Sequence, residues 1–208
     1  MKSNFNLIAP VYDPLAHLVY GNNLIRAKKE FFQKIPPGAR ILLMGGGTGN
    51  ILNDIFENNP SLQIDFVEPS HAMIRIARKR LQGKFQTRVN FICGDHRSIP
   101  AGISYNAVTS FFVLDCFKQE EAFEFCKAIT AGLEQNGTWL FADFFYTENK
   151  LQRGLIWFMY RFFRTVANIP ANKLPDYNAL MEQLNFRMID ERYFLKGLIR
   201  SQILQRRK

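Results

Sequence analysis

The sequence predicts an α/β domain with a mainly parallel sheet and helices on both faces. Apolar runs typical of buried strands alternate along the chain with segments of helical periodicity. The first apolar run ends in a cluster of glycines, as happens where a buried strand turns sharply. The length of 208 residues, with 47% hydrophobic and 22% charged residues, suits one globular domain, 1–208, with a substantial core.

Seven strands are expected, and the last one is predicted to run antiparallel to its neighbours. Five of them cover residues 40–45, 62–68, 89–95, 105–115 and 137–145. Residues 186–207 supply two more, joined through Gly197 and antiparallel to each other.

Helices are expected over residues 15–35, 50–58, 70–83 and 119–135. Ser70 is the expected N-cap of the third of these helices, and Gly83 its end. The pair Asn136-Gly137 predicts a turn before the fifth strand. Residues 1–37 are expected to form a helical cap, and the aromatic, basic segment 147–185 a lid-like insertion.

The net charge, the cysteine and histidine counts and the length of the apolar runs limit the partners that this protein is expected to bind. A net charge of +9 favours anionic partners, although a basic protein without such a partner is an equally good interpretation. Three cysteines and three histidines, all scattered, predict no metal site and no disulfide framework, and reduced thiols in a cytoplasmic protein are the simplest account. No apolar run is long enough to cross a bilayer, which leaves peripheral contact with an anionic membrane open.

The stretch ILLMGGGTGN, residues 41–50, predicts a ligand-binding turn. Gly45, Gly47 and Gly49 alternate with other residues, but Asn50 stands where the dinucleotide fingerprint has its third glycine. No Lys-Ser or Lys-Thr pair follows, so a phosphate-gripping loop is excluded. The glycines therefore fit close approach to a ligand that lacks a pyrophosphate.

Acidic residues end the next two strands. Glu68 ends the second strand, where a carboxylate can accept hydrogen bonds from ribose hydroxyls. Asp95 ends the third, where a carboxylate can accept from the amino group of adenine. Either acid alone could be a surface or capping residue. Together with the glycine turn they line one rim of the predicted sheet, which favours a nucleoside-containing ligand.

On these motifs the sequence resembles the class I S-adenosylmethionine-dependent methyltransferases. ILLMGGGTGN resembles their glycine-rich first motif, IDFVEPS their acidic strand end and ICGDHRSIP their adenine-binding segment. The opening FNLIAPVYDPLAHLVYGNNLIRAKKEFF is similar to the start of the branch that contains the ubiquinone and menaquinone C-methyltransferases. The resemblance implies a Rossmann-like methyltransferase fold, S-adenosyl-L-methionine as cofactor and methyl transfer as the reaction.

The expected cofactor-binding residues follow from the motifs and from the stabilisation of a cationic sulfonium by aromatic faces. They are Tyr12, Gly45, Gly46, Gly47, Gly49, Glu68, Pro69, Asp95, His96 and Phe112. One departure stands out, because the family usually has an acid two residues before the first glycine and this chain has Leu43. That departure keeps open a second hypothesis, a partner-binding protein with a degenerate site.

Methyl transfer from a sulfonium needs positioning and exclusion of water more than a catalytic triad or a metal. A general base is needed only if the acceptor must lose a proton. Asp115 is the first candidate, followed by His17, Asp143 and Tyr146, and a capping role for Asp115 is an equal alternative.

A small, hydrophobic acceptor is the preferred hypothesis. The segment 150–173 carries five basic and no acidic residues among many aromatic side chains, which fits a lid over an apolar ligand, a membrane-facing helix, or a helix packed on the sheet. The motifs of base-amino and cytosine methylation are missing, so a nucleic-acid acceptor is disfavoured and an RNA methyltransferase is kept as the last alternative.

Overall fold

The computed structural model describes residues 5–207, so the first four residues of the predicted 1–37 cap lie outside the described part of the chain. Seven strands form one sheet in the order β3-β2-β1-β4-β5-β7-β6. Their bounds are β1 Arg40–Met44, β2 Gln63–Glu68, β3 Val89–Cys93, β4 Tyr105–Phe111, β5 Leu133–Phe144, β6 Phe186–Phe194 and β7 Ile199–Arg206.

β7 is the strand of this sheet that runs in the direction opposite to the others. The pairs of β1 with β2 and β4, of β2 with β3, and of β4 with β5 are parallel. β7 pairs antiparallel with both β5 and β6. The predicted fold class, a mainly parallel seven-stranded sheet with an antiparallel last strand, is confirmed.

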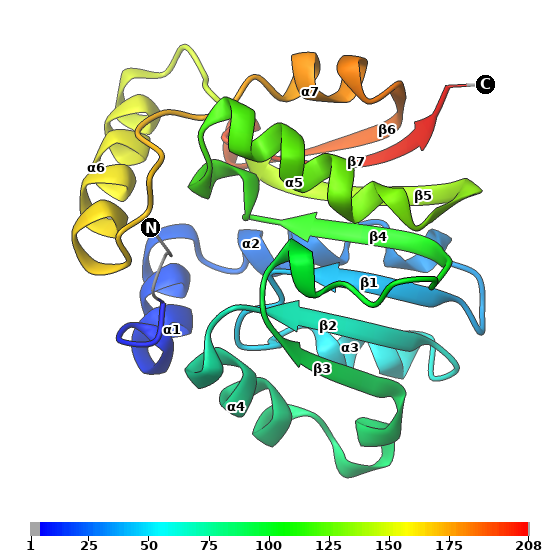
Figure 1. Cartoon of the computed structure of the whole chain (residues 1–208). Coiled ribbons are helices and arrows are strands. Elements are labelled where there is room, and N and C mark those ends of the chain that lie inside the picture. The colour runs from blue at the N-terminus through cyan, green and yellow to red at the C-terminus, as the bar shows by residue number, and fades with distance from the viewer. Residues whose placement is uncertain (1–4, 208) are drawn as a thin grey trace.

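Helices cover both faces of the sheet (Figure 1). Strand residues such as Ile41 and Leu43 point into one core, which α2, α3, α4 and α6 cover, whereas Leu42 and Met44 point into the core beneath α5 and α7. The helix bounds are α1 Ala9–Tyr20, α2 Asn23–Lys29, α3 Leu52–Asn58, α4 His71–Arg80, α5 Gln119–Ala131, α6 Lys150–Val166 and α7 Tyr177–Gln183.

The predicted helix 15–35 was wrong as a single helix. α1 begins earlier, at Ala9, and the chain breaks at Gly21, which has a φ of 56° and separates α1 from α2. Left-handed backbone cannot continue a right-handed helix, and glycine adopts it without steric cost. A 3-10 turn, Phe32–Lys34, follows before the first strand.

The predicted turn at Asn136-Gly137 was also wrong, because both residues lie inside β5. α5 ends at Ala131 and β5 starts at Leu133, several residues before the predicted start. The pairing with β4 shifts register here, so residues 134–137 form an irregular stretch. A Cβ on Gly137 would lie 2.5 Å from Leu133 Cδ1 and 3.0 Å from the Asn106 and Glu134 carbonyl oxygens, so a larger residue would force its neighbours to shift.

Other boundaries differ by a few residues. Ser70 caps α4 as predicted, since its side chain accepts from the Met73 N–H at 3.2 Å, but the helix ends at Arg80 and Gly83 instead begins a 3-10 segment. The fourth strand ends at Phe111, and residues 114–116 form a 3-10 turn that positions Asp115.

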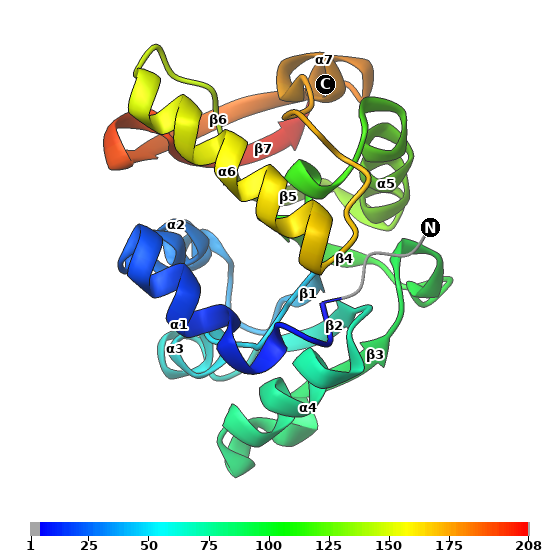
Figure 2. The same cartoon turned by 90° about the vertical axis from the view of Figure 1, so that its left-hand side faces the viewer.

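The carboxyl ends of the parallel strands face α1 and α6 (Figures 1 and 2). In Figure 2 these two helices lie in front of the sheet, on either side of the strand ends. Loops that follow the strands thus meet residues from the N-terminal helix and from the segment 147–185 at one edge of the sheet.

Candidate functional site

The glycine-rich loop after β1 combines tight packing with one open position. Gly45, Gly47 and Gly49 have φ values of 63°, 58° and 65°, the left-handed region that favours glycine. A Cβ on Gly46 would lie 2.2 Å from the Phe66 ring, whereas a Cβ on Gly47 would meet no atom within 4 Å. Gly47 therefore presents its backbone to open space, as a ligand cradle requires.

Glu68 at the end of β2 holds this loop. Its carboxylate accepts from the backbone N–H of Gly47 at 3.0 Å and from that of Ser70 at 2.9 Å. The side chain is only 5% exposed, and burial raises its pKa, while the two N–H donors and the charge of Lys28 oppose that rise. Each oxygen keeps a free lone pair for a further donor such as a hydroxyl.

A second acid, which the sequence did not single out, ties the N-terminal helix to the same loop. Asp13 on α1 accepts from the Thr48 hydroxyl at 2.7 Å, from Asn50 Nδ2 at 3.2 Å and from Arg80 at 2.8 Å. The Arg80 guanidinium also donates to the Thr48 carbonyl at 3.2 Å. α1 is thus held against the glycine-rich loop by a polar network that runs from the buried Thr48 through Asp13 to the exposed Arg80.

Lys28 on α2 brings a cation close to the charges of Asp13 and Glu68, whereas Leu43, which stands where an acid was expected, supplies no charge. Leu43 is 2% exposed and lies in the apolar core, so it offers no polar atom to a ligand. The Lys28 ammonium lies 5.9 Å from the centre of the Phe112 ring. Burial lowers the pKa of Lys28 to about 8, against the opposing charges of Asp13 and Glu68.

Asp95 and His96 follow β3 at the same edge of the sheet. The carboxylate of Asp95 accepts from the Arg97 backbone N–H at 3.0 Å and pairs with the Arg97 guanidinium, which together lower its pKa to about 2. The His96 ring lies edge-on to Phe125, with centroids 5.8 Å apart. The amino group of a ligand that binds here would therefore share the Asp95 carboxylate with the exposed Arg97 guanidinium.

An apolar cavity of about 200 Å³ lies between α1 and α6. Tyr12 and Phe112, both predicted to face the sulfonium, line it. Phe112 has a φ of 55°, an unusual conformation for a bulky residue, and its ring packs 5.2 Å from that of Phe144. Most of the wall is aliphatic or aromatic. Residues 15–24 contribute Leu15, Ala16, Val19, Tyr20 and Leu24, and residues 155–169 contribute Leu155, Phe158, Met159, Phe162, Phe163 and Ile169.

Asp115 brings a carboxyl group to this wall, beside the thiol of Cys116. Asp115 is buried, and burial raises its pKa to about 6. Asp143 lies behind it and accepts from the Leu114 and Asp115 N–H groups at 3.2 and 3.4 Å. Burial first, and the Asp115 charge second, raise the pKa of Asp143 well above its ordinary value. The two acids therefore titrate as a pair.

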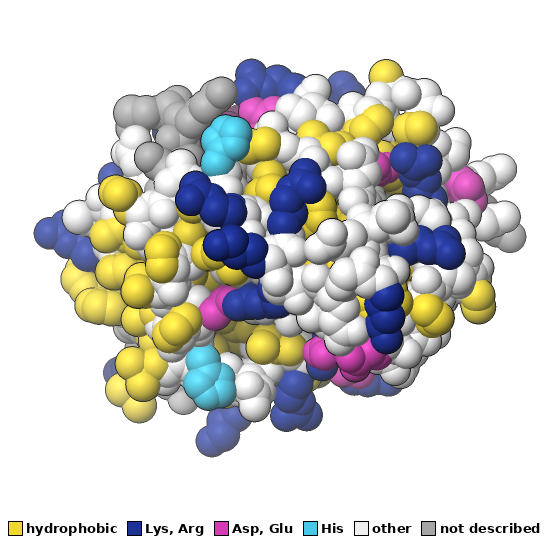
Figure 3. All heavy atoms as spheres, turned by 90° about the horizontal axis from the view of Figure 1, so that it is seen from below, with side chains coloured by type: hydrophobic (Ala, Val, Ile, Leu, Met, Phe, Trp, Pro, Cys, Tyr) yellow, Lys and Arg dark blue, Asp and Glu magenta, His cyan; other side chains and the backbone are white. Residues whose placement is uncertain are grey.

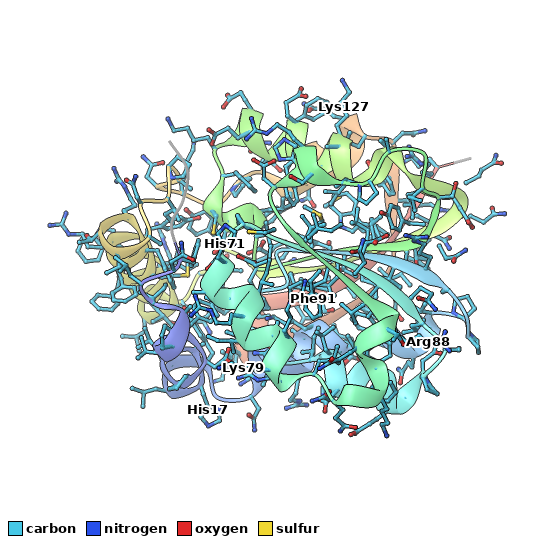
Figure 4. The ribbon with its side chains drawn as sticks, turned by 60° about the horizontal axis from the view of Figure 1, so that its bottom comes forward. His17, His71, Lys79, Arg88, Phe91 and Lys127 are labelled. Carbon is cyan, nitrogen blue, oxygen red and sulfur yellow. The ribbon has the colours of Figure 1, made fainter. Side chains whose placement is uncertain are left out.

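The remaining candidates lie apart from the cavity. His17 is exposed at the outer edge of α1 (Figure 4), although it borders a second hollow with Asp13, Lys28 and Arg80. Tyr146 is half-exposed, and its hydroxyl accepts from the Leu174 N–H at 3.2 Å. Pro69 is exposed beside Glu68, and its carbonyl accepts from the Cys93 thiol at 3.7 Å. The roles assigned to these three residues stay predictions.

Two other kinds of site are absent from residues 5–207. No group of three or more His, Cys, Asp or Glu side chains in that range is arranged to hold a metal ion. No helix within it combines the length and apolar character needed to span a membrane.

One protein-family model matches the sequence. Residues 41–137, slightly less than half of the chain, match the model of a methyltransferase domain. No curated protein matches the sequence.

Solved structures extend the likeness to the whole chain. An O-methyltransferase family protein from Burkholderia thailandensis has 17% identity and a TM-score of 0.71 over 97% of this chain and 58% of its own. A chain from the complex between the Haloferax volcanii Trm112 methyltransferase activator and a proposed methyltransferase has 12% identity and a TM-score of 0.75, with complete coverage of both.

The fold is the Rossmann-like methyltransferase fold. A third neighbour, the O-methyltransferase NcsB1 of neocarzinostatin biosynthesis, was solved with S-adenosylmethionine and a naphthoic acid, at 12% identity and a TM-score of 0.70 over 97% of this chain and 58% of its own. The chain thus spans somewhat over half the length of several O-methyltransferases that it matches. The domain match and the fold are thus likenesses to methyltransferases over part of the sequence and over the whole fold, respectively.

Proposed function

We propose that this chain transfers a methyl group from S-adenosyl-L-methionine to a small, apolar acceptor that binds between α1 and α6. One juxtaposition carries the proposal. An open glycine loop, held by the buried Glu68, lies at the same edge of the sheet as an apolar cavity whose wall contains the buried Asp115. The segment 147–185 would act as a lid and residues 1–37 as a cap over this edge.

The residues present fit the cofactor. Gly47 leaves room for a ligand against the backbone, and Glu68 has acceptor capacity left for ribose hydroxyls. Lys28 supplies a cation that would pair with the carboxylate of the methionine moiety. Tyr12 and Phe112 offer aromatic faces, and Gly45, Gly46, Gly49, Pro69, Asp95 and His96 complete the proposed set. When bound, the cofactor supplies a methyl group already activated on a sulfonium.

The chain's own contribution to the chemistry is orientation, exclusion of water and one proton acceptor. The aromatic wall would hold a planar apolar acceptor and keep water from the reacting atoms. Asp115, with its pKa raised to about 6, would be ionised at neutral pH and accept a proton from an acceptor hydroxyl. Tyr160 positions this residue, since its hydroxyl donates to the Asp115 carbonyl at 2.9 Å.

An aromatic hydroxyl is the acceptor group that this wall favours. The NcsB1 neighbours bind naphthoic acids, including 1,4-dihydroxy-2-naphthoic acid, which makes such compounds sensible probes for this chain. Membership of the quinone C-methyltransferase branch is the alternative within the proposal, with a ring carbon in place of the hydroxyl oxygen as the methylated atom. It rests on the opening residues, which form α1 and α2 and reach the site through Asp13 and Lys28.

The proposal is tested by incubating the protein with methyl-labelled S-adenosylmethionine and a panel of hydroxynaphthoic acids and quinols. Label is expected in an organic-phase product, and Asp115→Asn is expected to reduce that transfer at neutral pH by a factor of about 100 or more. Cys116→Ser, which changes the neighbouring wall residue but keeps a donor to the Asp115 carboxylate, is the matched control. Tight cofactor binding with no transfer to any member of the panel would count against the acceptor class.

A second candidate is a partner-binding protein with a degenerate methyltransferase site. The buried Leu43 favours it, because that position has no polar atom for the cofactor. The Haloferax volcanii complex contains a protein partner, but that partner is a methyltransferase activator, so the complex does not favour a degenerate site. A folded protein that binds neither S-adenosylmethionine nor its demethylated product would select this candidate.

A further inference from the structure

The outer surface shared by α1 and α6 carries apolar side chains that the protein does not cover. They are Leu7, just before α1, Val11, Leu18 and Val19 on α1, and Leu151, Trp157 and Phe158 on α6. Both helices lie on the side of the molecule that faces the reader in Figure 2, and hydrophobic side chains gather along that side in the space-filling view of Figure 3. We call this set of seven residues the outer apolar face.

Basic residues accompany the outer apolar face. Lys150, Arg153, Arg161 and Arg164 are all exposed on α6, and the helix contains no acidic residue. The one acid of α1, Asp13, is turned inward to Thr48 and Arg80. Exposed positive charge interleaved with large apolar side chains, and no exposed acid on either helix, is the pattern of a helix face that lies on an anionic bilayer.

The apolar cavity opens on the same surface. Val19 on α1 and Phe158 on α6 both line the cavity and are both exposed, so they form part of its rim. Leu151 and Phe158 are seven residues apart on α6 and therefore lie on one face of that helix. The outer apolar face is thus continuous with the wall of the cavity.

We propose that the outer apolar face rests on the surface of an anionic lipid bilayer, with Trp157 and its apolar neighbours in the interfacial region and the arginines of α6 among the lipid headgroups. The inference concerns the surface of the protein and does not depend on methyl transfer. If the proposed function also holds, an apolar acceptor would reach the cavity from the lipid phase.

Intrinsic fluorescence provides a direct test, because the chain has two tryptophans in opposite environments. Trp139 is 0% exposed, whereas Trp157 is 68% exposed, so a change in emission on adding vesicles would report on Trp157. With vesicles of equal parts phosphatidylcholine and phosphatidylglycerol we expect a blue shift and protection from acrylamide. Trp157→Phe should still sediment with these vesicles but lose the shift.

Charge variants test whether the basic residues of α6 bind the anionic headgroups. Arg161→Gln/Arg164→Gln should weaken co-sedimentation on the order of tenfold at low salt. Arg88→Gln/Lys127→Gln removes the same charge from exposed positions that Figure 4 places away from α1 and α6, and it should sediment like the wild type. Circular dichroism would establish that each variant is folded.

Three results would overturn the proposal. One is failure of the wild type to sediment with the anionic vesicles, and another is equal sedimentation with pure phosphatidylcholine vesicles. The third is concentration-dependent self-association without vesicle binding, abolished by Trp157→Glu, which would make the outer apolar face an interface between two copies of this chain.

Discussion

The Thr48 hydroxyl lies 2.7 Å from a carboxylate oxygen of Asp13, so the N-terminal helix is hydrogen-bonded directly to the glycine-rich loop. Arg80 joins both residues from α4. This network fixes the distance between α1, which forms one wall of the apolar cavity, and the loop that would hold the cofactor. Positioning of acceptor and cofactor relative to each other therefore depends on Asp13.

Asp13→Ala should lower the stability of the fold. The substitution leaves Thr48 and Arg80 without their shared acceptor, a loss of about 1–3 kcal/mol. For a chain of this length each kcal/mol corresponds to roughly 2–4 °C in Tm. Thermal unfolding followed by circular dichroism measures the effect. Asp54→Ala, which breaks an exposed ion pair with Lys29, should lower Tm far less, and equal losses would contradict the role of the network.

Glu68→Gln should destabilise the loop and abolish cofactor binding. An amide group can accept through one atom only, so the N–H of either Gly47 or Ser70 would face an NH₂ donor inside the protein. The expected cost is about 1–3 kcal/mol, measured by urea unfolding. Glu57→Gln at an exposed position is the control. Wild-type stability together with wild-type cofactor affinity would show that Glu68 does not hold the loop.

Lys28→Met should stabilise the protein while weakening cofactor binding. Burial lowers the pKa of Lys28 from 10.5 in the unfolded chain to about 8 in the folded protein, so folding disfavours the charged form. Between these two pH values the unfolded chain binds more protons, and stability should therefore rise with pH. Removing the charge should increase Tm by roughly 2–4 °C if about 1 kcal/mol of this penalty is relieved. Calorimetric titration should give weaker binding of S-adenosylmethionine. Unchanged affinity would remove Lys28 from the cofactor site.

Affinity for the anionic end of the cofactor should also fall as pH rises through 8. Lys28 loses its proton in that range, and the attraction to a carboxylate disappears with it. The same pH series on Lys28→Met should be flat, and a decline of equal size in the variant would assign the pH dependence to another group.

Activity is expected to rise with pH through about 6. Asp115 must be ionised to accept a proton, and its pKa is raised to about 6. Because this pKa exceeds the value in the unfolded chain, the folded protein binds more protons between those two pH values, and stability should fall as pH rises through the same window. Asp115→Asn should flatten the rate profile, whereas Asp143 and Glu68, whose pKa values burial also raises, should keep stability dependent on pH. A rate profile without an inflection near pH 6 would exclude Asp115 as the base.

The fold could be predicted because its main signals are local. Ile41 to Met44 form an apolar run that ends in glycines, Glu68 ends β2, and Asp95 follows the end of β3 on the same rim. Parallel strands place such ends together without any further information. Ser70 as a cap is equally local, since its hydroxyl reaches only three residues along the chain.

The errors have different causes. Asn136-Gly137 has the composition of a turn, but Gly137 lies inside a strand, where a Cβ would come within 3.0 Å of the Asn106 carbonyl oxygen, and tertiary packing overrode the local preference. The break at Gly21 was missed because apolar residues continue on both sides of it.

Asp13 and Lys28 are residues of the candidate site that the sequence did not reveal. Their partners, Thr48 and Arg80 for Asp13 and Glu68 and Phe112 for Lys28, lie tens of residues away along the chain. Only the folding of α1 and α2 against the carboxyl ends of the strands brings them together. An acid before a proline and a lysine in a basic helix carry no signal of their own in a single sequence.

The most direct test of the central claim is calorimetric titration with S-adenosylmethionine and its demethylated product, comparing wild type, Gly47→Arg and Gly102→Arg. Gly47 and Gly102 both have positive φ and open space where a Cβ would be, so the two variants carry similar backbone strain, but Gly102 precedes β4 at the opposite edge of the sheet. Micromolar binding is expected for wild type and Gly102→Arg, and none for Gly47→Arg. Binding that survives Gly47→Arg, or that folded wild type lacks, would contradict the assignment of this loop as the cofactor site.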